Sequence, residues 1–161
     1  NGQYLYEETK NSPSNFCIGT AGYPEKHFEA MNLSTDMKHL KKKVDAGAEF
    51  IVTQLFYDNE KFFDFVKKCR EIGIKVPIIP GIKPITNLRH LSFIPKFFHV
   101  NFPESFSNEL EKCKTDEEIK RVGIEWTTAQ CKELVKADIP VIHFYTMGRG
   151  TAVKNIAKEI F

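Results

Sequence analysis

Polar side chains follow two apolar segments at positions where they could contact a ligand. Gln54 interrupts the apolar run that begins at Phe50, and its amide can both donate and accept hydrogen bonds to a flat heterocycle. The alternative is that it satisfies a neighbouring loop carbonyl. Tyr145 and Arg149 follow a second apolar run. An arginine there could hold a carboxylate or a phosphate in a bidentate pair, or form a structural ion pair.

A third polar group lies in a turn near the N-terminus. Tyr23, Glu25 and His27 occur within one short span, directly after the apolar segment 16–21. Residues that serve a ligand are often carried by such turns, but a turn of this kind can also be only a well-packed corner. The residue types leave both interpretations open.

The next segment has helical periodicity and carries charge. Asp36, His39 and Lys43 are spaced so that they share roughly one face of a helix. The run that contains Lys41 and Lys42 is more typical of a solvated helix face. If a phosphate lies nearby, Lys42 or Lys43 is its natural charge partner.

Histidine and cysteine show no spacing typical of a metal site, and none is expected. His90 and His99 belong to no metal motif, and we expect His143, inside a predicted strand, to be a buried core residue. The cysteines are scattered without a CxxC pair, which favours reduced thiols in a cytoplasmic protein. They are Cys17, Cys69, Cys113 and Cys131.

The composition is that of one soluble globular domain. The chain has 161 residues, of which 42% are hydrophobic, and this length can bury a real core. A net charge of +2 gives no support for general nucleic-acid binding. We see no signal peptide and no apolar run near the membrane-spanning length of about 18 residues, so neither export nor membrane insertion is indicated.

The candidate ligand-binding residues must be positioned by regular secondary structure. Four apolar segments are predicted to be strands. They are 16–21, the run starting at Phe50, 76–82 closed by Pro80-Gly81, and 140–146. Residues 1–15 are expected to form a connector or a frayed segment.

Each predicted strand is followed by a helical pattern. Ser34 or Thr35 can cap the first helix, and Asp58 or Asn59 the second. A capping box of Thr115 and Glu118 opens a long helix. The remaining helices begin near Thr86 and at Thr151, while residues 93–103 show no clear pattern.

The order is therefore a strand and a helix repeated four times over residues 16–161. This order predicts a parallel α/β sheet with right-handed crossovers. Four such units are about half of an eight-stranded (β/α)8 barrel. A small doubly wound sheet is the alternative, although no GxGxxG follows any strand.

Four motifs together resemble the methylenetetrahydrofolate reductase family. They are AGYPEKHFEA (21–30), the run 36–58, PIIPGIKPI (77–85) and HFYTMGR (143–149), and they occur in family order. The resemblance implies a TIM barrel with non-covalent FAD. It also implies an oxidoreductase of one-carbon and methionine metabolism that reduces 5,10-methylenetetrahydrofolate to 5-methyltetrahydrofolate with NADH or NADPH.

The resemblance also implies roles for individual residues. Gln54 matches a glutamine that contacts folate and nicotinamide in turn, and Tyr145 and Arg149 match folate-binding positions. His90 lies near another substrate position. The positions that match FAD contacts are Tyr23, His27, Ala30, Asp36, His39, Lys42 and Lys43.

Only the C-terminal half of the family barrel is matched. The glutamate that acts as general acid in the family lies on an earlier strand, so we expect these residues alone to be catalytically incomplete. A longer protein or a second copy or chain would supply the other half, and a non-catalytic flavin- or folate-binding fragment is the alternative. A half-barrel should expose two sheet edges and an open apolar interior.

Overall fold

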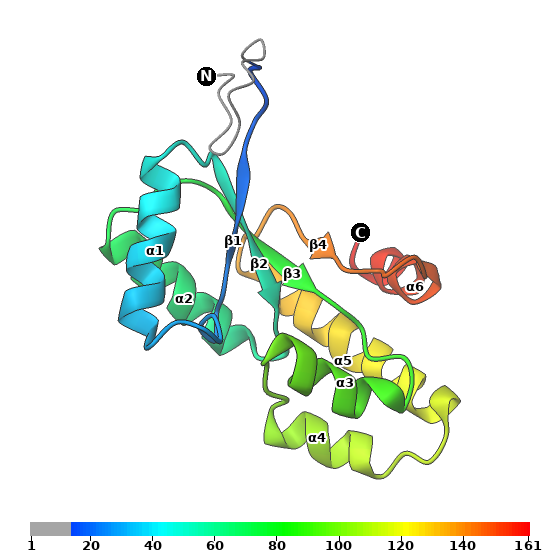
Figure 1. Ribbon diagram of the computed structural model, residues 1–161. Helices are drawn as coiled ribbons and strands as arrows, with labels where there is room; N and C mark the ends of the chain where they lie inside the picture. The colour runs from blue at the N-terminus through cyan, green and yellow to red at the C-terminus, as the bar shows by residue number, and fades with distance from the viewer. Residues whose placement is uncertain (1–13) are drawn as a thin grey trace.

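A computed structural model describes residues 14–161, and its centre is a four-stranded parallel sheet. The strands are paired in the order in which they occur along the chain. Figure 1 shows their shared direction, with the arrows of β2 and β3 pointing toward α3 and α4. The strands are β1 (Gly19–Gly22), β2 (Phe50–Leu55), β3 (Ile78–Ile82) and β4 (His143–Phe144).

The strand order confirms the predicted class of fold. A doubly wound sheet reverses its strand order at a switch point, whereas this sheet runs β1-β2-β3-β4 without a reversal. Successive parallel strands joined by helical crossovers are the repeating unit of a (β/α)8 barrel. The chain therefore forms four β/α units, half of such a barrel, and the doubly wound alternative is wrong.

The helices follow the strands as expected, with one helix that the sequence pattern did not predict. That helix, α4, begins directly after the region 93–103, where the sequence showed no clear pattern and where the end of α3 lies. Pro95 lies inside α3, and no side chain caps α3 or α4, so the usual boundary signals are missing. The helices are α1 (Leu33–Asp45), α2 (Asn59–Glu71), α3 (Arg89–Phe98), α4 (Glu104–Glu111), α5 (Asp116–Lys136) and α6 (Thr151–Ile160).

Local capping signals account for two of the helix starts. The side chain of Asp58 accepts a hydrogen bond from the backbone of α2, and Thr115 with Glu118 forms the predicted capping box of α5. The helix predicted for this segment is present as α1, but its predicted cap, Ser34 or Thr35, was wrong. Asn32 is its cap, because the Asn32 side chain accepts a hydrogen bond from the amide of Thr35 at 2.9 Å.

Strand boundaries differ more from the prediction. β1 begins at Gly19, where pairing with Phe50 starts, and the Phe16 side chain before it is 81% exposed. Pro80 and Gly81 lie within β3 instead of closing it. β4 contains only two residues, because its ladder with β3 joins only Gly81 and Ile82 to His143 and Phe144.

The core lies between the helices and one face of the sheet. Ile51 of β2 and Ile82 of β3 pack there with Phe62 of α2 and with residues of α1, α5 and α6. A second cluster, around Leu55 and Tyr57, packs against α3, α4 and α5. Because α1, α2, α5 and α6 all contribute to the first cluster, they cover the same face, as in a barrel wall.

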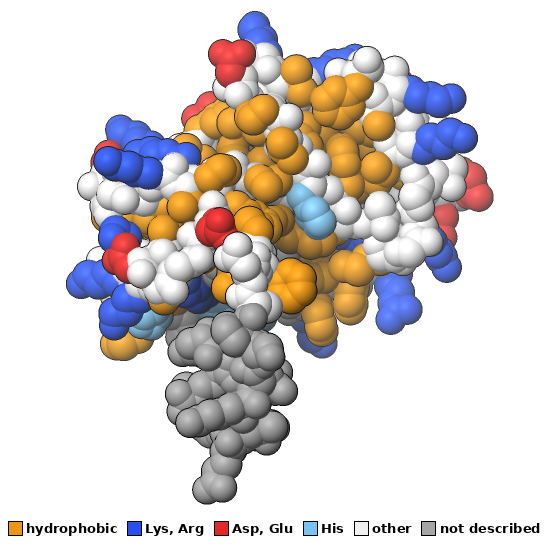
Figure 2. Space-filling model, turned by 90° about the horizontal axis from the view of Figure 1, so that it is seen from above, with side chains coloured by type: hydrophobic (Ala, Val, Ile, Leu, Met, Phe, Trp, Pro, Cys, Tyr) orange, Lys and Arg blue, Asp and Glu red, His pale blue; other side chains and the backbone are white. Residues whose placement is uncertain are grey.

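The opposite face of the sheet is open. Along β2 burial alternates, so that Ile51 is buried while Val52 and Gln54 on the other face are only half-buried. His143 is exposed there, so the expectation of a buried core histidine was wrong: β4 has no helix over this face. Figure 2, a view from above, shows hydrophobic side chains gathered in the middle of the visible surface with charges around them.

Within residues 14–161 no helix is long and apolar enough to cross a membrane.

Candidate functional site

Gln54 lies at an irregularity near the end of β2. The register between β2 and β3 shifts between Val52 and Leu55, so the regular ladder is interrupted. The Gln54 Oε1 atom accepts a hydrogen bond from the Leu55 amide at 2.9 Å. The carboxamide oxygen therefore replaces a ladder partner, and the Nε2 group, which forms no hydrogen bond with residues 14–161, can donate to a ligand.

The aromatic ring of Tyr145 lies across the carboxyl end of the sheet. Its hydroxyl donates a hydrogen bond to the Thr53 carbonyl at 2.9 Å, reaching past β3 from the loop after β4. Gly81 makes this possible, because a Cβ atom there would come within 2.2 Å of the Thr53 oxygen and 2.6 Å of the ring. Tyr145 is thereby hydrogen-bonded to the residue that precedes Gln54.

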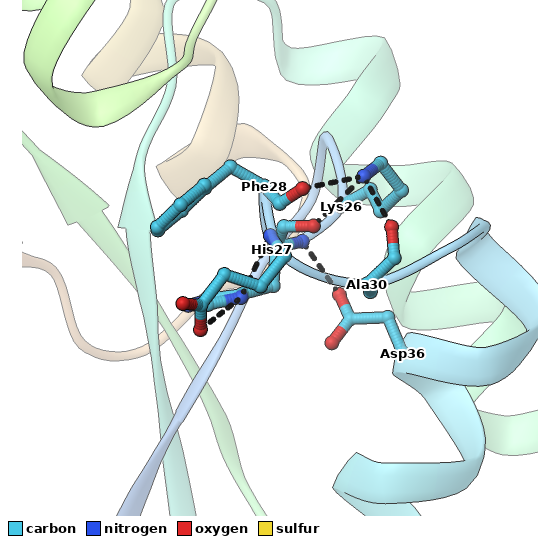
Figure 3. A network of polar contacts seen from close by, with 6 residues as sticks. Lys26, His27, Phe28, Ala30 and Asp36 are labelled. Carbon is cyan, nitrogen blue, oxygen red and sulfur yellow. Dashed lines mark hydrogen bonds and ion pairs between the residues drawn. The ribbon is translucent and has the colours of Figure 1, made fainter.

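The loop between β1 and α1 is held by polar contacts to its own backbone (Figure 3). The His27 amide donates to Asp36 Oδ2 at 2.8 Å, which ties the loop to the first turn of α1. The Lys26 ammonium donates to the carbonyls of His27 and Ala30 at 2.9 and 2.7 Å. The Lys26 ammonium is therefore bound by carbonyl groups of its own loop. The Lys26 backbone adopts a positive φ of 84°.

Aromatic residues of the same loop make two ring contacts. The rings of Tyr23 and His27 meet edge to face at 4.6 Å, and Phe28 stacks on His99 at the end of α3. Burial, with the Asp36 carboxylate as a second cause, raises the pKa of Tyr23. Burial and then the proximity of Tyr23 raise the pKa of Tyr145.

Glu25 holds the same loop in place through contacts with two distant segments. Its position in a turn did not reveal this role. Its carboxylate accepts from the Lys61 ammonium and the Asn101 side-chain amide, both at 2.6 Å. The Glu25 side chain is only 7% exposed. No local signal could have found these contacts, because Lys61 lies on α2 and Asn101 follows α3.

The charged residues predicted on α1 do not form a single group. Asp36, His39 and Lys43 lie on one side of the helix, as their spacing predicts, and both His39 and Lys43 are exposed. Lys42 is separate from them, since it lines a groove between α1 and α2 together with Lys38. The structure therefore brings Asp36, but not Lys42, to the His27 loop.

A larger groove opens between the loops that follow β3 and β4. It has a volume of about 1260 Å³ and contains Arg149, whose side chain is exposed and forms no ion pair with residues 14–161. Lys83, directly after β3, is buried, and its ammonium lies 3.5 Å from the Tyr145 carbonyl. Sequence reasoning missed Lys83, although a lysine directly after a buried strand was the signal available.

His90 lies on the α3 side of this groove. Its Nδ1 atom accepts a hydrogen bond from the Thr86 amide at 3.2 Å. Burial, followed by the nearby positive charge of Lys83, lowers the pKa of His90 to about 4. His90 is therefore neutral at physiological pH. No cluster of three or more metal-ligating side chains occurs within residues 14–161.

Comparison with known proteins identifies relatives of this chain. The sequence profile described as methylenetetrahydrofolate reductase matches residues 4–160. A Caenorhabditis elegans relative, a probable methylenetetrahydrofolate reductase (NADPH), is 41% identical over 90% of this chain. An Arabidopsis thaliana relative, methylenetetrahydrofolate reductase (NADH) 1, is 44% identical over 82% of this chain. A Salmonella typhimurium relative, 5,10-methylenetetrahydrofolate reductase, is 36% identical over 84%.

The chain spans only part of these relatives: 22% of the worm protein, 24% of the plant protein and 46% of the bacterial protein. A solved structure of a Clostridium thermocellum protein, described as binding two copies of 5-methyl-5,6,7,8-tetrahydrofolic acid, has the same fold. The TM-score is 0.61 at 19% identity, over 89% of this chain and 52% of that one. With the family profile covering almost its whole length, this chain belongs to the methylenetetrahydrofolate reductase family.

Proposed function

We propose that residues 16–161 form the C-terminal half of the catalytic barrel of an FAD-dependent methylenetetrahydrofolate reductase. The complete barrel would reduce 5,10-methylenetetrahydrofolate to 5-methyltetrahydrofolate with NADH or NADPH. The observation that carries this proposal is the hydrogen bond from Tyr145 to Thr53, the residue before Gln54, at the carboxyl end of the sheet in a chain of this family. Ligands of parallel α/β barrels bind at that end.

The loop after β1 and the adjacent side of α1 have donors and acceptors that suit FAD. The Asp36 carboxylate can accept hydrogen bonds from ribityl hydroxyl groups, and His39 and Lys43 are exposed on the same side of α1. Lys43 forms no ion pair with the described residues 14–161, so its charge is available to a phosphate. Tyr23, His27 and Ala30 would border the flavin. When bound, FAD would carry the hydride between the nucleotide and the folate.

We assign substrate binding to residues at the end of β2 and in the loop after β4. The Gln54 Nε2 group would donate to the folate or the nicotinamide, which would use the site in turn. Tyr145 would contact the folate, and Arg149 would bind an anionic group of it. Through the family resemblance, the proton that the folate requires is assigned to a glutamate on an earlier barrel strand, outside this half.

Flavin binding and reductase activity test the proposal at two levels. We would purify the chain with and without the complementary half of the barrel, add FAD, and record the visible spectrum of the protein fraction. The expected result is bound flavin in the combined protein, together with NAD(P)H oxidation that depends on methylenetetrahydrofolate. Bound flavin without activity would favour the non-catalytic binding module. If the combined protein neither binds flavin nor oxidises NAD(P)H, the reductase proposal and the binding-module alternative are both refuted.

A further inference from the structure

Lys83 is a buried cation without a carboxylate partner. Only 6% of the residue is exposed, yet no Asp or Glu of residues 14–161 forms an ion pair with it. Its hydrogen bond to the Tyr145 carbonyl is long, at 3.5 Å. Burying an ammonium group without a counter-charge costs folding free energy, so such a lysine is usually paired or serves a ligand.

The surroundings of Lys83 are also positive. Arg149 and Arg89 line the same groove, and the acid that lines it, Asp116, already accepts a hydrogen bond from the Leu88 amide at 2.8 Å. Lys120 lies at the exposed rim. A groove lined by four cationic side chains and one engaged carboxylate attracts an anion.

One wall of the groove is aromatic. The rings of Phe93 and Phe97 stack with centroids 5.1 Å apart, and the two residues remain 37% and 65% exposed. The Arg89 guanidinium lies 5.7 Å from the Phe93 ring centre. An aromatic wall beside buried positive charge suits a ligand that combines a flat ring with an anionic arm.

We propose that Lys83 and Arg149 form an anion subsite that binds a carboxylate or phosphate carried by a ligand in this groove. The identity of the ligand rests on the proposed function: the glutamate arm of a folate and the phosphates of the dinucleotide both supply this chemistry. The subsite itself rests on the burial of Lys83 and on the absence of a carboxylate partner among the described residues.

His90 supplies an internal reporter of this subsite. Burial and the charges of Lys83, Arg149 and Arg89 lower its pKa, and only Asp116 acts in the opposite direction. Burial also lowers the pKa of Lys83. An anion bound between Lys83 and Arg149 would offset the positive charge that His90 experiences. Its pKa should then rise from about 4.

The first test uses inorganic phosphate and the variant Lys83→Met, compared with Lys75→Met, which removes an exposed lysine. Phosphate at constant ionic strength should raise the thermal midpoint of the wild-type protein and of Lys75→Met, but not of Lys83→Met. In the absence of phosphate, Lys83→Met should be at least as stable as the wild type, because it removes a buried unpaired charge. Lys83→Arg should keep the phosphate response.

Nuclear magnetic resonance of the His90 ring gives a second readout. Phosphate should raise the His90 pKa in the wild type and leave it unchanged in Lys83→Met. A destabilised Lys83→Met protein whose phosphate response is intact would overturn the subsite, since Lys83 would then have a structural partner instead.

The second test distinguishes the two sources of the anion in the complete enzyme. We would compare 5-methyltetrahydrofolate with an analogue that lacks the glutamate, and NADPH with NADH. Lys83→Met should weaken at least one anionic ligand about tenfold or more, equivalent to about 1.4 kcal/mol. A loss confined to the glutamate-bearing folate identifies the carboxylate arm, and a loss confined to NADPH identifies its additional phosphate. Equal loss of both nucleotides identifies the phosphates that they share.

The failures of the two proposals are distinguishable. If wild-type enzyme binds the folates and nucleotides and Lys83→Met binds them equally well, the assignment of this subsite to those ligands is wrong. If none of them binds to the wild type while phosphate still stabilises it through Lys83, the proposed function fails and the anion subsite remains.

Discussion

The Tyr145 hydroxyl donates a hydrogen bond to the Thr53 carbonyl at 2.9 Å, across the intervening strand β3. The bond joins the loop after the last strand to β2 at the point where the β2–β3 register shifts. It exists because Gly81 leaves room for the ring. One side chain therefore links the loop after β4 to the carboxyl end of β2, and it also borders the proposed folate site.

Replacing Tyr145 with Phe should cost about 1 kcal/mol of unfolding free energy, the net value of a typical hydrogen bond. Tyr23→Phe is a matched control, because the Tyr23 hydroxyl forms no hydrogen bond with residues 14–161. Urea unfolding of both variants would measure the difference. Equal stability of the two variants would show that the Tyr145–Thr53 bond contributes nothing.

Gly123→Ala should be destabilising by about 1–3 kcal/mol, the usual cost of overpacking. A Cβ atom at Gly123 would lie 2.0 Å from the Ile85 carbonyl oxygen, so α5 would have to move away from the segment after β3. Gly150→Ala is the control: its Cβ would meet no atom within 4 Å. We expect Gly150→Ala to change the free energy of unfolding by less than about 1 kcal/mol. A mild Gly123→Ala variant would show that α5 is not held closely there.

Two substitutions of Gln54 should separate its structural role from its ligand role. Gln54→Glu keeps an oxygen that can accept from the Leu55 amide but loses the NH2 donor. In the complete enzyme it should weaken folate and nicotinamide binding, without loss of FAD or of stability. Gln54→Leu should also lower the unfolding free energy by about 1–3 kcal/mol, because the Leu55 amide loses its partner. Loss of FAD from Gln54→Glu would contradict the assignment of Gln54 to the substrate side.

Glu25→Gln should loosen the loop between β1 and α1. The substitution removes the charge that pairs with Lys61 in a largely buried setting, so the 23–30 amides should exchange with solvent faster. Glu71→Gln, at an exposed residue at the end of α2, is the control. Hydrogen exchange followed by mass spectrometry measures both. Unchanged exchange of the loop in Glu25→Gln would refute this anchoring role.

Stability should fall in acid partly because of His90. Its folded-state pKa is about 4, below the ordinary value of 6.5, so the neutral form is favoured by folding. Its contribution is therefore complete above about pH 6.5 and is lost as the pH falls to about 4. The loss should be on the order of 1–3 kcal/mol after allowance for solvent screening. His90→Gln should flatten the pH dependence of the free energy of unfolding in this range. The exposed residue His143 offers the control His143→Gln, and equal slopes in both variants would contradict the role of His90.

Much of the architecture is encoded by signals that act within a few residues. The Asp58 cap, the Thr115–Glu118 capping box and the alternation of strands with amphipathic helices all appear in the sequence. These signals depend on backbone hydrogen bonds between near neighbours, so they do not require the rest of the fold. The family motifs likewise follow the strands to which they were assigned.

The sequence by itself therefore determined the half-barrel, its family and the segments that carry Gln54, Tyr145 and Arg149. Only the tertiary structure decided that Tyr145 reaches Thr53 and that Glu25 binds Lys61. It likewise decided that Lys83 is buried and lines the same groove as Arg149. These contacts join residues from different β/α units, and their geometry depends on how each crossover places its loop. Strand ends and the exposure of His143 were decided at the same level, because pairing and burial belong to the assembled sheet and not to its local sequence.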